Sequence, residues 1–243
     1  MKKFLPAFFL AAALFAAAPV FALTLFESTE TCPFDKTTFS SQKMGSGTTF
    51  GYRLDLKPLG AVAAPAPMGQ CPKCSFPMYE DSFSKEDIEK LQPIVESERF
   101  AKEAKGKSPY LALGVVFEML EKEPGAIAWT YLRATWENEN KPDYDAAAKK
   151  AIEFFTKASA KIKAELKDGE KPDEKYFTNL CLAIELSRRI KNFDEVKKLI
   201  AAARVEMQDE ANQFLLQVLD YEERLATEKD SAPHPISDVE KTL

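Results

Sequence analysis

The pattern of apolar and polar residues changes near residue 84. From Ser84 onward it is typical of helices, and Asp87 stands near the positive end of the first one. Pro/Gly breaks separate the later helices, and the connections are short enough to predict antiparallel neighbours. The pattern therefore predicts a mainly α domain over 84–228, a stack of helical hairpins. Its helices are expected at 84–105, from Ser108-Pro109 onward, and at about 125–139, 143–167, 173–190, 193–206 and up to about 228.

Residues 23–83 have a different pattern, which predicts strands and turns. Apolar residues occupy every second position here, with glycine or charged residues between them, which is the period of a half-buried strand. They are Phe50, Tyr52, Leu54 and Leu56. The preceding KMGSGTT is typical of a hairpin turn, and KPLGAVAAPAPMGQ of an irregular loop. The segment has few large apolar residues, so this small β head needs a staple or a neighbour to pack on.

The helices contain a faint internal repeat. Twice, a small residue is followed four positions later by a large one and three positions after that by another small one. The second match begins 45 positions after the first. That pattern is typical of the second helix of a tetratricopeptide unit, and an aromatic–leucine–aromatic set upstream suits the first helix. The alternative is an ordinary amphipathic bundle with similar spacings. The residues concerned are Ala151, Phe155 and Ala158; Val196, Ile200 and Ala203; and Trp129, Leu132 and Trp136.

The first residues predict export. Lys2 and Lys3 precede an apolar run over 4–21, and the small residue Ala22 precedes a cleavage position before Leu23. This is the layout of a secretory signal peptide over 1–22, which places the mature protein in the bacterial periplasm or outside the cell. The alternative is an anchor kept in the membrane, because the run is just long enough to span a bilayer.

Composition excludes several classes of function. Without the two lysines the charge falls from −5 to −7, so a nucleic-acid partner is not expected. The single histidine, His234, lies in the tail 229–243, which lacks an apolar face and is predicted to be disordered. No glycine-rich phosphate loop or histidine-based catalytic group is therefore predicted, and we expect a protein that is not an enzyme.

Three cysteines fall in the head at suggestive spacing. Cys71-Pro-Lys-Cys74 directs two sulfur atoms to one point, which is half of a tetrahedral zinc site. Cys32-Pro-Phe-Asp35 has the same spacing, with a carboxylate in place of the fourth thiolate. Since zinc accepts carboxylate oxygen, Cys32, Asp35, Cys71 and Cys74 are predicted to hold one structural zinc ion.

Two alternatives remain for these thiols. In an oxidising compartment Cys71 and Cys74 could form a stabilising disulfide. They could also act as a thiol-disulfide oxidoreductase, although Pro77 blocks the helix that follows such a motif in thioredoxin-like proteins. The fourth cysteine, Cys181, lies in the apolar stretch YFTNLCLAIEL and is predicted to be a small buried hydrophobic residue.

The head motifs and the helices together resemble a bacterial family of uncharacterised proteins, domain of unknown function 2225. The resemblance rests on Cys32-Pro33, Phe39, Cys71-Pro72, Cys74, Phe76 and Phe83, and on AWTYLRATWENEN and LAIELSRRIKNFDEV. It implies a zinc-ribbon-like head with paired CPxC motifs before tetratricopeptide-like helices, and a binding or scaffold role. Asp35 departs from the family pattern, where cysteine is expected, and so does Ser75, where glycine is usual.

We therefore expect a periplasmic or secreted scaffold that binds a protein or peptide and makes no membrane contact after signal cleavage. The candidate contact residues are aromatic and basic ones in the helices, although aromatic residues at this spacing are more often core. Paired arginines at a helix end are usually solvated. These candidates are Tyr110, Trp129, Tyr131, Arg133, Trp136, Arg188 and Arg189.

Overall fold

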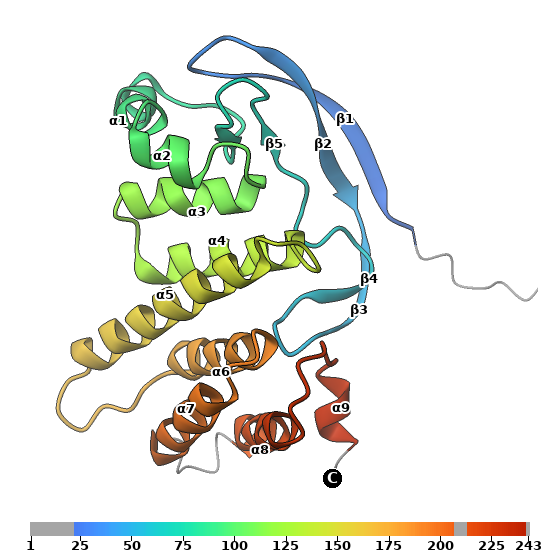
Figure 1. Ribbon diagram of the computed structural model, residues 1–243, viewed down its shortest axis with the longest axis vertical. Coiled ribbons are helices and arrows are strands. Elements are labelled where there is room, and N and C mark those ends of the chain that lie inside the picture. Colours follow the sequence, from blue (N-terminus) through green and yellow to red (C-terminus); the bar gives the residue numbers. More distant parts are fainter. Residues whose placement is uncertain (1–21, 207–212, 242–243) are drawn as a thin grey trace, which may run out of the picture.

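The computed structural model describes residues 22–206 and 213–241. The predicted signal peptide, apart from Ala22, therefore lies outside the described residues. Three antiparallel hairpins precede a stack of helices (Figure 1). The strands are β1 (Thr24–Thr31), β2 (Thr38–Ser46), β3 (Thr48–Tyr52), β4 (Pro58–Ala61), β5 (Gly69–Gln70) and β6 (Pro77–Met78). None of the helices in the described ranges is long and apolar enough to cross a membrane.

The helices confirm the predicted mainly α class and stack of hairpins. They are α1 (Lys85–Val95), α2 (Glu98–Glu103), α3 (Pro109–Met119), α4 (Pro124–Glu137), α5 (Tyr144–Glu165), α6 (Glu174–Arg189), α7 (Phe193–Glu206), α8 (Gln213–Thr227) and α9 (Ser237–Glu240). Local caps explain several of these boundaries. Ser84 and Asp87 form a reciprocal capping box at α1, and Asp173 accepts a hydrogen bond from the Tyr176 backbone at α6.

One predicted helix is divided in two. We expected a continuous helix over 84–105, but α1 ends at Val95 and α2 begins at Glu98. The Ser97 side chain accepts a hydrogen bond from the Phe100 backbone and so caps a new helix. The break allows Leu91 and Ile94 of α1 and Phe100 of α2 to enter the same apolar cluster.

The repeat positions lie in the core between consecutive helices. Ala151 and Phe155 of α5 pack against Leu132 of α4 and Leu182 of α6. Val196, Ile200 and Ala203 of α7 occupy the next cluster, between α6 and α8. Small residues here let adjacent helices approach, as the predicted pattern requires. A close approach also occurs at Gly114 of α3, where an added Cβ would lie 2.5 Å from the Tyr131 ring of α4.

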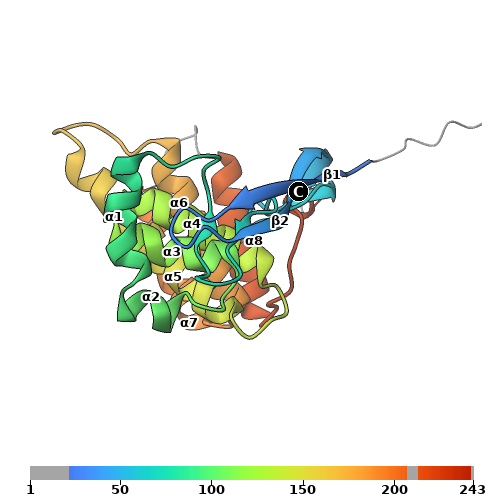
Figure 2. The same ribbon diagram turned by 90° about the horizontal axis from the view of Figure 1, so that it is seen from above.

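The hairpins lie along one side of the stack (Figures 1 and 2). The β1–β2 ribbon and the β5–β6 hairpin lie beside α1–α3, while β3–β4 lies near the other end of the stack, beside α6 and α9. Gly69 is necessary where β5 meets the ribbon, because a Cβ there would lie 1.9 Å from a Glu30 carboxylate oxygen. Leu54, beyond β3, packs with Tyr221 and Val239.

The predicted face of the third strand is only partly covered. Leu54 is buried, as its alternating position predicts, but the side chains of Phe50 and Tyr52 are 67% and 50% exposed. The alternating pattern therefore placed a strand here but did not show that Phe50 and Tyr52 are largely exposed, while Leu54 beyond β3 is buried.

The prediction of a disordered tail over 229–243 is wrong for residues 229–241. Val239 of α9 is 1% exposed and packs against Leu54. The backbone joins the end of β3 through Leu54 N to His234 O (2.9 Å) and Ile236 N to Tyr52 O (2.8 Å). The segment has almost no apolar face of its own, so these tertiary contacts order it.

Candidate metal centre

The turn between β1 and β2 forms the first half of the centre. Cys32 N donates to Thr37 O at 2.9 Å, and Lys36 N donates to Cys32 O at 3.1 Å. Lys36 adopts a left-handed backbone conformation, with φ of 60°. Thr37 N donates to Asp35 Oδ1 at 3.0 Å, which fixes the carboxylate on the inner side of the turn. The sequence folds locally so that Cys32 and Asp35 face one point.

The turn between β5 and β6 repeats this geometry. Cys71 N donates to Phe76 O at 3.0 Å, and Ser75 N donates to Cys71 O at 2.9 Å. Ser75 has φ of 65°, at the position equivalent to Lys36. The left-handed conformation explains why glycine suits this position in such turns. Serine adopts it here, and its Oγ accepts a hydrogen bond from Gly106 N at 3.3 Å.

The two turns bring all four predicted ligands together. One ligand atom from each of Cys32, Asp35, Cys71 and Cys74 lies within 4.8 Å of every other one. The two sulfur atoms of Cys32 and Cys74 are 3.6 Å apart, and Cys71 Sγ lies 3.4 Å from Asp35 Oδ2. Among the described residues this is the one group of three or more cysteine, histidine or acidic side chains with such spacing.

These distances fit tetrahedral zinc. With Zn–S bonds of about 2.3 Å and Zn–O bonds of about 2.1 Å, two thiolates lie about 3.8 Å apart, and a thiolate and a carboxylate oxygen about 3.6 Å apart. The observed separations of 3.6 and 3.4 Å are each about 0.2 Å shorter. The group could therefore hold a metal ion with little rearrangement.

The electrostatics of the group also suit a cation. Burial raises the pKa of the Cys32 thiol, and burial together with the neighbouring thiols of Cys71 and Cys32 raises that of Cys74. Burial also acts to raise the pKa of Asp35, but hydrogen bonds from Thr37 outweigh it and lower the pKa overall. A carboxylate thus lies among thiols that resist ionisation. A bound divalent cation would favour their thiolate forms.

An aromatic shell surrounds the centre. The Phe76 ring meets the Phe34 ring edge-on at 4.7 Å and the Phe83 ring at 5.4 Å. Cys32 and Cys71 are 0% and 1% exposed, and they belong to one apolar cluster with Phe100 of α2 and Val116 of α3. The centre therefore joins the β1–β2 ribbon, the β5–β6 hairpin and the first helices.

Cys181 lies outside this group, as predicted. It packs among apolar residues of α6 and α8, and burial raises its pKa to about 12. All four cysteines are free.

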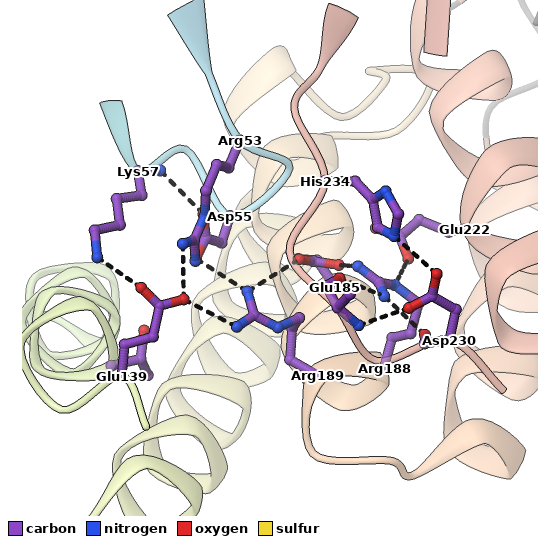
Figure 3. Close-up of polar contacts among 12 residues, drawn as sticks. Arg53, Asp55, Lys57, Glu139, Glu185, Arg188, Arg189, Glu222, Asp230 and His234 are labelled. Carbon is purple, nitrogen blue, oxygen red and sulfur yellow. Dashed lines mark hydrogen bonds and ion pairs between the residues drawn. The ribbon is translucent and has the colours of Figure 1, made fainter. Parts of the chain in front are cut away.

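The predicted contact residues in the helices do not form an exposed surface. Arg133 is exposed, but Tyr110, Tyr131 and Arg188 are buried, and Trp129 and Trp136 are half-buried. The interpretation of Arg188 and Arg189 as a solvated pair is wrong, because Arg188 is 0% exposed and the Arg189 side chain 7%. Both arginines belong to a network of charged groups (Figure 3).

Arg188 holds the tail. Its Nε donates to Glu222 Oε2 at 2.7 Å, and its Nη2 donates to Glu185 Oε2. Its Nη1 donates to the carbonyl oxygens of Asp230 at 2.8 Å and Ala232 at 3.0 Å (Figure 3). One guanidinium therefore joins α6, α8 and the segment before α9.

The rest of the network holds the loop between β3 and β4. Glu139, just beyond α4, accepts from Arg53 at 2.7 Å, Lys57 at 2.8 Å and Arg189 at 3.1 Å (Figure 3). The buried Asp55 accepts two further bonds from Arg53. The sequence analysis missed this network. The available signal was an acidic residue inside an apolar helix, Glu185 in LCLAIEL.

Comparison of the chain with protein-family models, with curated proteins and with solved structures finds no match.

Proposed function

We propose that this protein is an exported, non-enzymatic scaffold that binds another protein or a peptide, and that a structural zinc ion fixes its β hairpins to its helices. The observation that carries the metal part is the convergence of Cys32, Asp35, Cys71 and Cys74 within 4.8 Å. When bound, the ion would cross-link two segments 39 residues apart. Kinship with domain of unknown function 2225 belongs to the same proposal, supported by paired turns before a helical stack.

The geometry favours metal over the two thiol alternatives. All four cysteines are free, and the sulfur atoms of Cys32 and Cys74, from different hairpins, are 3.6 Å apart, whereas a disulfide needs about 2.05 Å. Redox-active thiols have lowered pKa values, but burial raises the pKa of Cys32 and Cys74. The mildly acidic chain also supports a protein partner over nucleic acid.

The test is to express the full chain with export and to measure both zinc and free thiols in the denatured protein. About one zinc per chain, with all cysteines free after chelation, is the expected result. Zinc-free protein lacking two free thiols would identify a disulfide. Turnover in a disulfide-reduction assay that disappears in Cys71→Ser would instead identify an oxidoreductase.

Asp35 requires its own variant. Asp35→Ala should weaken zinc binding, measured by competition with a chromogenic chelator, because it removes one of four ligands. Asp81→Ala is the matched control, since the Asp81 side chain is fully exposed near the ribbon and is not one of the four ligands. Equal zinc affinity in the two variants would contradict the assignment of Asp35 as a ligand.

A further inference from the structure

The outer edge of β1 lacks a neighbouring strand in the described residues. β1 pairs with β2 in a sheet of two strands, and the other two hairpins form sheets of their own. The ribbon extends beyond the helical stack when it is seen from above (Figure 2). An isolated ribbon of two strands is only marginally stable in water. The chain thus exposes an edge eight residues long.

The backbone groups that point outward from this edge follow from the hydrogen-bond pattern. Cys32 N donates to Thr37 O at the turn. Antiparallel strands bond through alternate pairs, so Glu30–Phe39 and Ser28–Ser41 are the next bonded pairs. The N–H and C=O groups of Thr29 therefore point away from β2, free to bond to another strand.

The same edge has uncovered apolar side chains on both faces. Of the eight exposed large hydrophobic residues in the described ranges, three lie in or just before β1 (Leu23, Leu25 and Phe26) and a fourth, Met44, lies on β2. Leu25 is 38% exposed and stands across from Met44, itself 37% exposed, while Phe26 on the opposite face is 51% exposed. Such a concentration marks an interaction surface. A strand placed beside β1 would turn one set of its side chains toward Phe26 and the other set toward Leu25 and Glu27, which share a face. Apolar residues suit the first set, and lysine or arginine, whose methylene stem covers Leu25 while its charge meets Glu27, suits the second.

The charge along this edge is negative. Glu27 is exposed and lies between Leu25 and Thr29 on the outer face of β1; its carboxylate accepts a hydrogen bond from Ser40 Oγ at 3.1 Å. Lys43, the basic residue of β2 near it, is paired with Glu30 at 2.9 Å. Among the described residues, no basic side chain forms an ion pair with Glu27. A basic residue on an added strand would do so.

We propose that the outer edge of β1 receives an extended segment of a partner protein, in which apolar residues alternate with lysine or arginine, as a third strand. This inference rests on the proposed scaffold function and names the chemistry of its partner. Backbone hydrogen bonds at Thr29 provide the attachment, and Leu25, Phe26 and Glu27 provide the selectivity.

The test uses a short blocked peptide of alternating valine and lysine with a fluorescent label, added to zinc-loaded full-length protein. Its anisotropy should rise on binding. Thr29→Pro should weaken binding by about tenfold or more, because proline removes the outward N–H and is tolerated at a sheet edge. Glu27→Lys should weaken the lysine peptide and strengthen a valine–glutamate peptide. Glu165→Lys, the same charge change at an exposed position on α5, should do neither.

Several results would overturn the inference. They are no binding to the unaltered protein, equal binding by Thr29→Pro, or no exchange of peptide preference in Glu27→Lys. A dimer detected by light scattering and lost in Thr29→Pro would assign the edge to a second copy of the chain. Sedimentation with lipid vesicles would assign the apolar residues to a membrane. Because zinc content is measured separately on the same samples, failure here is distinguishable from failure of the metal proposal.

Discussion

Two parts of the molecule fix a hairpin loop to the helical stack by different means. At one end, four side chains from two similar turns converge with a geometry suited to a metal ion. At the other end, arginines and carboxylates from β3–β4, α4, α6, α8 and the tail form a continuous buried network (Figure 3). The first arrangement could hold an added cation, whereas the second supplies its own cations.

This difference determines how each end should fail. Removing the ion leaves a cluster of thiols that can become neutral, so the site can persist in an uncharged, looser form. Removing one arginine leaves buried carboxylates without a cation, and an unpaired buried charge is costly. The metal centre should therefore respond to chelators and the network to mutation and pH.

The largest effect should come from loss of the metal. In the proposed function, chelation or Cys71→Ser removes a zinc cross-link, and the binding free energy of such ions is of the order of 10 kcal/mol in small zinc domains. The β1–β2 ribbon should then become sensitive to protease, while the helical circular dichroism is largely retained. Limited proteolysis with mass spectrometry of the fragments measures this. Cys181→Ala, which lacks a role at the centre, should keep its zinc and its resistant ribbon.

Arg188→Met should have the next largest effect. It leaves Glu185 and Glu222, each 1% exposed, without their shared cation and releases two backbone carbonyls of the tail. Loss of one partner of a buried ion pair costs about 3–5 kcal/mol. Urea unfolding should show this loss, and Arg133→Met on the exposed face of α4 should unfold at nearly the unaltered concentration. Equal midpoints for the two variants would contradict a stabilising role of the network.

The opposite ends of the network should respond oppositely to pH. Burial, and then the neighbouring Glu185, raise the pKa of Glu222 well above its usual range. The stability that Glu222 contributes is fully present below its pKa of about 4.3 in the unfolded chain, and it is lost as the pH rises through its pKa in the folded protein. Burial acts to raise the pKa of Glu139 as well, but hydrogen bonds from Lys57 and Arg53 lower it to about 2. That contribution is present above pH of about 4.3 and is lost as pH falls toward 2.

Glutamine variants separate these two responses. Glu222→Gln imitates the protonated acid. The variant should therefore lose less stability than the unaltered protein at alkaline pH and have nearly the same stability at acidic pH. Glu139→Gln should lower stability at neutral pH and approach the unaltered protein under acid conditions. Urea unfolding from acidic to alkaline pH measures both. Parallel pH profiles for the two variants would show that the network titrates as one unit.

The parts of the structure that were predicted from sequence depend on local chemistry. Ser84, Pro109 and Asp173 act within one turn of the helices that they begin. The two Cys-Pro turns likewise direct their side chains through bonds within six residues, so the spacing predicted that these four side chains converge. Glu185 lies within one turn of Arg188, but the other partners of Arg188 lie 34 and more residues away, so the sequence did not show that this local pair joins a buried network. The tail was missed because the cluster that buries Val239 is formed by residues far away in the sequence, such as Leu54 and Tyr221.

The smallest effect concerns the backbone of the second turn. Ser75 has φ of 65°, a conformation that costs a residue other than glycine about 1–2 kcal/mol. Its Oγ also accepts a hydrogen bond from Gly106 N, whose net contribution is about 1 kcal/mol. Ser75→Ala loses the hydrogen bond and keeps the strain, whereas Ser75→Gly loses the bond and relieves the strain. We expect Ser75→Gly to melt close to the unaltered protein and Ser75→Ala below both, measured with zinc bound. If the order of the two variants is reversed, the turn does not hold this residue in the left-handed conformation, and the similarity of the two halves of the centre ends at their ligands.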